Sequence, residues 1–345
     1  MEAARLHEYT DEMSEGLSID EVSKPEATRS DDVVIEVEGA GWCRTDNNII
    51  RGWWNEYAPQ DLPMTLGHEN AGTVVEVGDE VSTVEVGDSV LCHPHVTCGT
   101  CRPCRQGDDM YCENASFPGL TTDGGFAKYL LTSERATIKL DTIDPVDIAP
   151  HADAGITAYH AAKKAARELN PGDYTLLIGI GGLGHIGLQS VHELSASRTI
   201  AVDVKDEALD LAESLGADHT INPTEEDVGE VVESITDGVG VKHTLDFVGA
   251  DETTSLAPDT LSAGGDHHII GYGGNVNQPS QTLVDGEFAF RGTLVGEYTE
   301  LQELVALVED GAMDLHTEEY SLSEINDVAQ RLEDNEIEGR AVIIP

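Results

Sequence analysis

The stretch Tyr174-Thr-Leu-Leu-Ile-Gly-Ile-Gly-Gly-Leu-Gly184 decides the fold of this chain. Its first part, Tyr174–Ile178, is a short apolar run typical of a buried strand, and glycines follow at fixed intervals. Gly179 permits a tight turn, Gly181 lets backbone approach a pyrophosphate, and Gly184 lets the next helix pack on the strand. A glycine-rich turn can also serve packing alone, but the strand–turn–helix context favours dinucleotide binding.

A helix beginning at Gly182 would direct free N–H groups and a positive dipole end at the phosphates. Asp203 ends the following strand, 24 residues after Gly179. A carboxylate there accepts hydrogen bonds from the ribose hydroxyls of NAD and repels the 2′-phosphate of NADP. Lys205 softens this repulsion, so we expect NAD to be preferred and NADP to remain possible. The alternative is that Asp203 is one more acid on an acidic surface.

Strands and helices alternate after the glycine turn, which predicts a parallel sheet with helices on both faces. The predicted strands are Tyr174–Ile178, Thr199–Val202, His219–Ile221, His243–Phe247 and His267–Ile270, with helices at Gly182–Leu194 and Glu207–Leu215. The part up to about Leu140 is β-rich, with strands at Val33–Val37, Gly72–Val77 and Phe126–Leu131. The pattern changes near Asp153, and a helix is predicted from Ala154 to Leu169. The tail predicts helices at Leu301–Val308 and Ile325–Leu332 and a strand at Ala341–Ile344. We therefore expect an α/β protein whose doubly wound Rossmann domain (153–296) is inserted into a β-rich domain (1–152, completed by 297–345).

Four cysteines lie within fifteen residues, in Cys98-Gly-Thr-Cys101-Arg-Pro-Cys104 and, eight positions on, Cys112. Thiolates at such spacings can converge on one tetrahedral Zn²⁺, and four ligands leave no position for water. A zinc here would thus be structural and would stabilise a lobe without a core of its own. Unliganded thiols and two disulfides are the alternatives.

The net charge of −47 comes from 66 acidic and 19 basic residues spread along 345 positions. Such a surface repels nucleic acid and anionic membranes, so neither is an expected partner. We interpret the charge as an adaptation to a salt-rich cytoplasm; an acidic protein of an ordinary cell is the alternative. The charged start of the chain is unlike a signal peptide, and the sequence has no apolar run long enough for a membrane span. Together with cysteines suited to a reducing compartment, this predicts a cytoplasmic location.

The segment Gly67-His68-Glu69-Asn-Ala-Gly72, followed by Gly78 and Val81, matches the pattern GHE-x2-G-x5-G-x2-V at every fixed position. On these residues the chain resembles the zinc-dependent alcohol dehydrogenases of the medium-chain dehydrogenase/reductase family. The resemblance covers nearly the whole chain. It implies a GroES-like catalytic domain, a four-cysteine lobe and a Rossmann domain.

The resemblance further implies a second, open zinc site. Its ligands would be Cys43, His68 and Asp153, where many relatives have a cysteine in the third position. Glu69 would be an outer or transient fourth ligand, and Asp46 would orient His68. Water or the alcohol oxygen would take the remaining position.

The family also implies a proton relay and a set of cofactor contacts. Thr45 would take the alcohol proton, but the histidine that continues the relay in several relatives is Asn48 here, so the proton must leave by another route. Pyrophosphate contacts would come from Arg44 and Arg340, although both could instead be surface arginines in salt bridges. The walls of the nicotinamide site would include Thr157, Val248-Gly249 and Gly271-Tyr272, unless these are ordinary strand-end turns.

The reaction implied is reversible hydride transfer between a primary or secondary alcohol and NAD(P), giving an aldehyde or ketone. Trp53, Trp54 and His95 are candidates for the substrate pocket, or else core or interface aromatics. A polyol or sugar dehydrogenase is the alternative enzyme. A non-catalytic zinc or nucleic-acid-binding protein is a third hypothesis, which the charge opposes. The compact chain favours the tetrameric branch of the family, hence a homotetramer.

Overall fold

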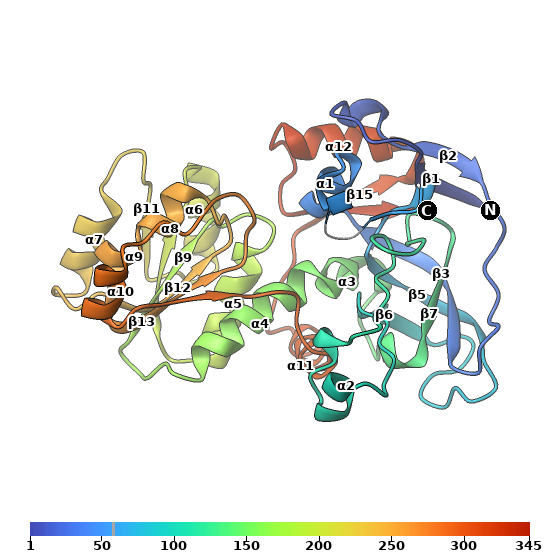
Figure 1. The fold of residues 1–345 in the computed structure, drawn as a ribbon, viewed down its shortest axis with the longest axis horizontal. Coiled ribbons are helices and arrows are strands. Elements are labelled where there is room, and N and C mark those ends of the chain that lie inside the picture. Colours follow the sequence, from blue (N-terminus) through green and yellow to red (C-terminus); the bar gives the residue numbers. More distant parts are fainter. Residues whose placement is uncertain (57–58) are drawn as a thin grey trace. The chain divides into compact units, whose positions relative to one another are not determined.

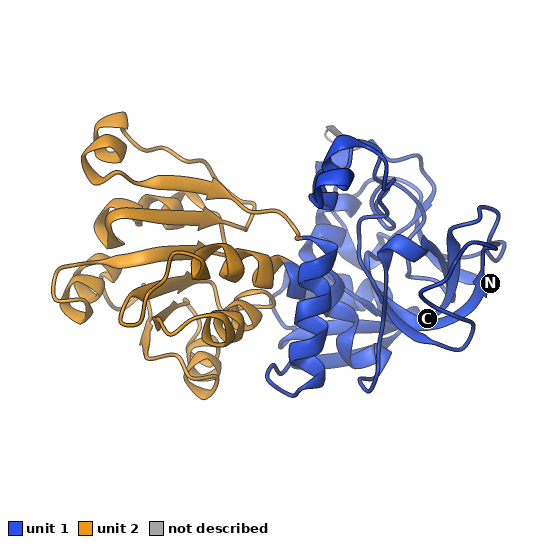
Figure 2. Cartoon of the chain, turned by 90° about the horizontal axis from the view of Figure 1, so that it is seen from below, with its two compact units in different colours: residues 1–156, 297–345 blue, residues 157–296 orange. Residues whose placement is uncertain are grey.

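The structure is a computed structural model that describes residues 1–56 and 59–345. The chain forms two compact units, of which unit 1 contains residues 1–156 and 297–345 and unit 2 contains residues 157–296 (Figure 2). Within the described residues, no helix has both the length and the apolar character needed to cross a bilayer.

Unit 2 is built on a six-stranded sheet in the order β11-β10-β9-β12-β13-β14, with every pair parallel. Figure 1 labels β9, β11, β12 and β13 of this sheet. The strand that comes first in the chain, β9, is central, and the order reverses there, as in doubly wound dinucleotide-binding sheets. The predicted α/β class is thus confirmed. The strands are β9 (Tyr174–Ile178), β10 (Arg198–Val202), β11 (His219–Ile221), β12 (Val241–Asp246), β13 (Leu261–Ile269) and β14 (Ala289–Gly292).

Helices cover both faces of this sheet because its strands are apolar on both sides. On one face Leu177 packs in a core with residues of α4, α5 and α6, and on the other Leu176 packs with residues of α7 and α9. The helices are α4 (Ala154–Ala166), α5 (Gly184–Leu194), α6 (Asp206–Ser214), α7 (Val228–Ile235), α8 (Asp251–Ser255), α9 (Ala257–Thr260) and α10 (Ser280–Gly286).

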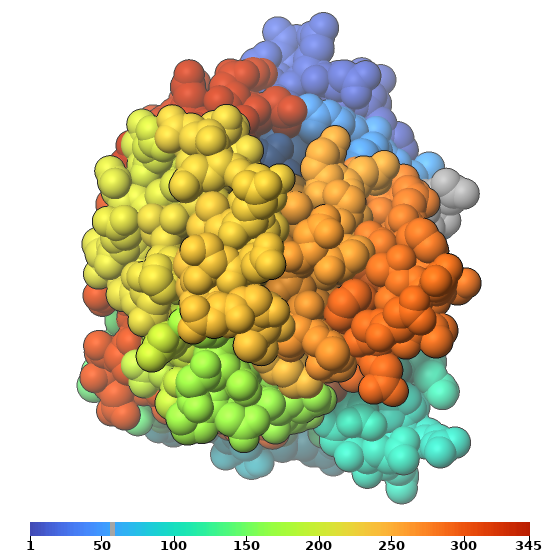
Figure 3. Space-filling view, turned by 90° about the vertical axis from the view of Figure 1, so that its left-hand side faces the viewer, coloured from blue at the N-terminus to red at the C-terminus, as the bar shows by residue number. Residues whose placement is uncertain are grey.

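The outer sides of α6 and α7 are strongly acidic. Exposed acids on these helices and the turn between them are Asp206, Glu207, Asp210, Glu213, Glu225, Glu226, Asp227, Glu230 and Glu233. The yellow segment in Figure 3 carries α7 and the preceding turn on one face of the molecule. On this face, acidic side chains therefore point toward solvent, where dissolved ions can screen them.

Unit 1 contains a seven-stranded sheet in the order β15-β16-β3-β5-β6-β8, with β7 also paired to β3, and a small sheet β2-β1-β4. The last strand pairs with β3 through Val342 opposite Gly41, so the C-terminal segment completes a sheet begun by the N-terminal one. The strands are β1 (Glu2–Leu6), β2 (Ser18–Glu21), β3 (Asp32–Gly41), β4 (Met64–Thr65), β5 (Glu69–Val77), β6 (Ser89–Cys92), β7 (Tyr129–Ser133), β8 (Thr137–Lys139), β15 (Thr317–Ser321) and β16 (Arg340–Ile344).

The helices of unit 1 are short except for α11 and α12. They are α1 (Arg44–Ile50), α2 (Arg102–Gln106), α3 (Pro145–Ile148), α11 (Tyr298–Glu309) and α12 (Ile325–Glu333), with 3-10 turns η1 (Met13–Glu15), η2 (Trp53–Glu56), η3 (Asp109–Tyr111), η4 (Glu134–Ala136), η5 (Ala149–Ala152) and η6 (Leu322–Glu324). Helix α12 packs its apolar side, including Val328, into the main core of the unit.

Several predicted boundaries were wrong, and the largest difference is at β13, which begins at Leu261 and not at His267. Helix α5 begins at Gly184 and not at Gly182, because the glycines before it form the turn. Strand β7 begins at Tyr129 and not at Phe126. The backbone N–H of Phe126 donates to the Leu66 carbonyl, outside β7, and its ring stacks on that of Trp42 with the ring centroids 5.0 Å apart.

Candidate active site

A buried acidic cluster forms where strand β3 meets helix α1. The β3–β5 register places Gly41 opposite Glu69, and Cys43 then caps the N-terminus of α1. Asp46 accepts a hydrogen bond of 2.9 Å from the Cys43 backbone N–H, which holds this turn. A Cβ at residue 41 would lie 2.0 Å from the Glu69 carboxylate, so only glycine fits there.

His68 lies at the centre of this cluster. Its Nδ1 is 3.2 Å from Asp46 Oδ1, and its Nε2 is 3.4 Å from Asp153 Oδ2. One potential ligand atom each of Cys43, His68, Glu69 and Asp153 lies within 4.8 Å of the others. The structure therefore brings together all the residues expected at the open zinc site, and it places Asp46 behind the histidine.

The charges of this cluster fit a bound cation. Burial by itself lowers the pKa of His68, but Asp46 and Asp153 outweigh burial and hold that pKa well above its usual value. Neither ring nitrogen has a well-aligned hydrogen-bond partner within the described part of the chain. A thiol, an imidazole and a carboxylate form a donor set that suits Zn²⁺, with room for a fourth ligand.

Glu69 is engaged by Arg340, a pairing that the sequence did not indicate. The guanidinium Nη2 lies 2.6 Å from Oε1 and also donates to Oε2, and the Ala154 N–H donates to Oε1 at 3.1 Å. Both side chains are buried, at 0% and 6% exposure. Burial raises the pKa of Glu69 to about 7, against the opposing effect of Arg340. In the structure the Arg340 guanidinium contacts Glu69. The contact with a pyrophosphate that we expected of Arg340 remains a prediction.

The relay and cofactor residues on α1 are more accessible. Thr45 and Asn48 are partly exposed, and Arg44 is exposed. The Arg44 guanidinium donates to the Leu332 carbonyl and to Asn335, each at 3.2 Å. The role expected of Arg44 toward a phosphate also remains a prediction.

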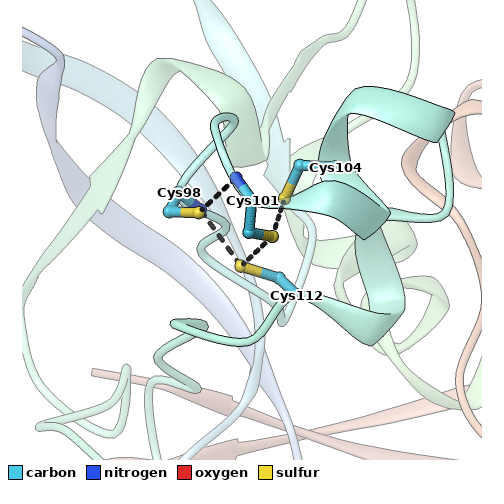
Figure 4. A group of neighbouring side chains, drawn as sticks. All are labelled: Cys98, Cys101, Cys104 and Cys112. Carbon is cyan, nitrogen blue, oxygen red and sulfur yellow. Dashed lines mark hydrogen bonds between the residues drawn. The ribbon is translucent and has the colours of Figure 1, made fainter.

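The four clustered cysteines form a compact lobe within unit 1 (Figure 4). Cys101 caps α2, Cys104 lies on this helix, and Cys98 and Cys112 flank it in loops. The sulfur of Cys101 is 3.4 Å from that of Cys104 and 3.9 Å from that of Cys112. Sulfurs around a tetrahedral zinc with bonds of about 2.3 Å are about 3.8 Å apart, so the separations fit.

Backbone N–H groups point at these sulfurs, as expected for thiolates. Cys101 donates to the Cys98 sulfur at 3.4 Å, and Cys98 donates to the Cys112 sulfur at 3.3 Å. N–H groups from Thr100 and Cys101 lower the pKa of Cys98 to about 5. All six cysteines are free, so the disulfide alternative is wrong for this structure.

The glycine turn has the geometry of a phosphate-binding loop. Gly179 has a φ of +86°, and a Cβ at Gly184 would lie 1.9 Å from the Gly179 carbonyl oxygen. A Cβ at Gly181, in contrast, would meet nothing within 4 Å, so the loop has space on that side. Gly182 continues this turn before α5 begins.

The Asp203 carboxylate accepts a hydrogen bond from the backbone of the glycine turn. Its Oδ2 accepts from the Ile180 N–H at 2.7 Å, and its Oδ1 accepts from the Lys205 N–H at 3.0 Å. Asp203 is therefore a carboxylate held in position at the end of β10 by two backbone N–H groups.

The residues expected at the nicotinamide site and the substrate pocket differ in how far they are exposed to solvent. Thr157 is nearly buried, whereas Val248 is 42% and Tyr272 is 56% exposed. A Cβ at Gly179 would lie 2.6 Å from a methyl of Val248, so that side chain borders the glycine turn. In unit 1, Trp53 is 58% exposed, which does not fit a core role, while Trp54 is partly buried. The remaining candidate for the substrate pocket, His95, packs edge-on against Phe117 at 4.8 Å.

Replacing Cys101 by alanine is expected to lose one zinc per chain and to lower the free energy of unfolding by about 3–5 kcal/mol, because a structural metal would lose a ligand. Cys92→Ala is the matched control. Its thiol is buried outside both clusters, where burial raises its pKa to about 12. Metal analysis and denaturant unfolding should show full zinc and a loss near 1 kcal/mol for this control. Equal zinc content in both variants would refute the metal assignment.

Comparison with known proteins identifies the relatives of this chain. Residues 29–142 match the family described as alcohol dehydrogenase GroES-like domain, and residues 182–310 match the family described as zinc-binding dehydrogenase. The crystal structure of the alcohol dehydrogenase from Aeropyrum pernix superposes with a TM-score of 0.95 at 47% identity, covering 100% of both chains. The NAD-dependent alcohol dehydrogenase of Saccharolobus solfataricus is 33% identical over 100% of both chains. A D-arabinose 1-dehydrogenase (NADP(+)) of the same organism is 35% identical, covering 96% of this chain and 95% of that one.

Proposed function

Because this chain belongs to the zinc-binding alcohol dehydrogenase family, we propose that it oxidises a primary or secondary alcohol with NAD and runs the reverse reduction. The products are an aldehyde or ketone, the reduced cofactor and a proton. The observation that carries the proposal is the buried set Cys43, His68 and Asp153, whose ligand atoms converge within 4.8 Å.

Cys43, His68 and Asp153 hold the catalytic zinc in this proposal, and the four-cysteine lobe holds a structural one. The catalytic ion supplies a Lewis acid that lowers the pKa of an alcohol hydroxyl. Asp46 holds His68 by Nδ1, which leaves Nε2 directed toward Asp153. Such outer carboxylates orient a ligand and raise its basicity.

Arg340 compensates the charge of Glu69 and keeps this carboxylate beside the ligand set without leaving it unpaired. Removing one partner of a buried ion pair costs about 3–5 kcal/mol, so the pair is also a support for the site. The Thr45 hydroxyl receives the alcohol proton. An asparagine cannot act as a base, so beyond Asn48 the proton passes to the cofactor ribose or to water.

NAD is the preferred cofactor, and NADP is a weaker one. Gly179, Gly181 and Gly184 form the turn under the pyrophosphate, and Asp203 accepts from the ribose. Thr157 and Val248 border the nicotinamide, and Arg44 contacts a phosphate. Arg340, whose guanidinium is buried against Glu69, is the weaker candidate for such a contact.

Changing Asp203 to glycine is expected to shift relative specificity toward NADP by about 1–3 kcal/mol, because it removes a ribose acceptor and a negative charge. The measurement is kcat/KM for both cofactors. Asp203→Asn is the control, since it keeps an acceptor for the Ile180 N–H while losing the charge. A wild type that already prefers NADP strongly would contradict the assignment.

A panel of short alcohols, sorbitol, glucose and D-arabinose tests the substrate class. Because the sequence is 35% identical to a D-arabinose 1-dehydrogenase, a sugar dehydrogenase is the second candidate function. Higher kcat/KM for alcohols supports the main proposal, and higher kcat/KM for a sugar replaces it.

We also propose that the protein is cytoplasmic, salt-adapted and a homotetramer. The balance of 66 acidic to 19 basic residues supports salt adaptation, cysteines suited to a reducing compartment support the cytoplasm, and the compact length of 345 residues supports the tetramer. Sedimentation at molar salt measures the oligomeric state.

A further inference from the structure

Unit 2 contains a third cluster of metal-binding residue types, on strands β12 and β13. The parallel register places His243 opposite Asp266, and His268 follows two residues later. Side chains two residues apart on a strand share a face, so all three project from the same side of the sheet. One ligand atom of each lies within 4.8 Å of the others.

The two histidines of this cluster are buried and unsatisfied. His243 is 1% and His268 is 2% exposed, and no nitrogen of either ring has a hydrogen-bond partner within residues 1–56 and 59–345. Neighbouring His267, on the opposite face, differs because its Nε2 lies 3.2 Å from Asp246 Oδ2. A buried polar group without a hydrogen-bond partner is unfavourable, so four such nitrogens on one face of the sheet favour a bound partner.

We propose that His243, Asp266 and His268 form a third metal site, which takes a divalent ion of the imidazole-binding type such as Zn²⁺ or Co²⁺. Two histidines and one carboxylate match a three-ligand set with open positions.

The surroundings supply access and support. His268 and Asp266, but not His243, line a surface pocket of about 310 Å³, so the cluster lies beside a hollow that is open to solvent. Arg291 Nε donates to Asp266 Oδ2 at 2.7 Å and so fixes the carboxylate while leaving Oδ1 for the ion. Lys164 and Arg167 also line the pocket. Their charge weakens the attraction for any cation, so affinity must come from the two imidazoles and is expected to be lower than at the cysteine lobe.

Cobalt binding tests the proposal, in protein that metal analysis shows to hold two zinc ions per chain, which fill the two proposed zinc sites and leave the third open. Co²⁺ is titrated in excess Mg²⁺, which occupies surface carboxylates but not imidazole sites. Equilibrium dialysis measures bound cobalt, visible absorption reports its ligand field, and metal analysis verifies that bound zinc is unchanged. The proteins are the wild type, His243→Gln, His268→Gln and Asp266→Asn. His219→Gln is the matched control, because this histidine is exposed on β11 in the same unit.

We expect one saturable Co²⁺ per chain in the wild type and in His219→Gln. The affinity should fall at least about 100-fold in each histidine variant and about 10-fold or more in Asp266→Asn, which conserves volume if a histidine variant folds poorly. The proposal is overturned by equal cobalt binding in all five proteins or by no saturable binding in the wild type. It is also overturned if inorganic phosphate, and not cobalt, stabilises the wild type against heat and this effect is lost in the variants, since the pocket would then bind an anion.

Discussion

Replacing Cys43 by alanine is expected to reduce kcat by about 10³-fold or more while leaving NAD affinity within about twofold. The substitution removes one of three ligands from the open site, so the ion that polarises the alcohol is lost or displaced. The cofactor loop and Asp203 belong to unit 2, whereas Cys43 belongs to unit 1. Single-turnover kinetics and fluorescence titration with NADH separate the two effects.

Cys92→Ala is again the suitable control, because it removes a buried thiol from unit 1 without touching either ligand set. Its kcat should remain within about twofold of wild type. Turnover by Cys43→Ala close to the wild-type rate would show that this thiol does not hold the catalytic ion. Loss of NADH binding together with kcat would instead indicate a general folding defect.

The glycine turn and the cysteine lobe could be predicted because each is local in sequence. All residues of the glycine turn (Gly179 to Gly184) and of the cysteine lobe (Cys98 to Cys112) are close in sequence. Their spacing alone therefore limits the local structures that they can form. Strand β9 matches its predicted bounds for the same reason: it is a run of five residues, four of them buried, that is followed directly by Gly179.

The Arg340–Glu69 pair could not be predicted, because its partners are 271 residues apart and meet only when β16 joins β3. The His243–Asp266–His268 cluster depends on strand register, which the alternating pattern alone leaves open. Strand β14 was missed because Ala289–Gly292 is a short edge strand that contains an arginine and a glycine. Strand β15 was missed because Thr317–Ser321 is acidic and has little apolar alternation.

The thermal midpoint and the activity are both expected to rise with KCl into the molar range, the midpoint by roughly 10 °C between about 0.1 and 2 M. The protein has 66 acidic against 19 basic residues, and helices such as α6 and α7 carry acids directed to solvent. At about 0.1 M salt the Debye length is about 10 Å, so neighbouring surface acids repel one another. At molar salt it is near 3 Å, and most of this repulsion is removed.

The same screening should leave the active site intact, because buried pairs are screened far less than exposed ones. Arg340 and Glu69 are buried, so their attraction persists at salt concentrations that remove the surface repulsion. Salt should therefore raise stability without weakening the ligand set, and zinc loss at low salt should follow unfolding and not precede it. Sucrose is the control, since it strengthens apolar burial without screening charge. A midpoint that is flat or falling from about 0.1 to 2 M KCl, or one that sucrose raises equally, would contradict the proposal that charge screening stabilises this protein.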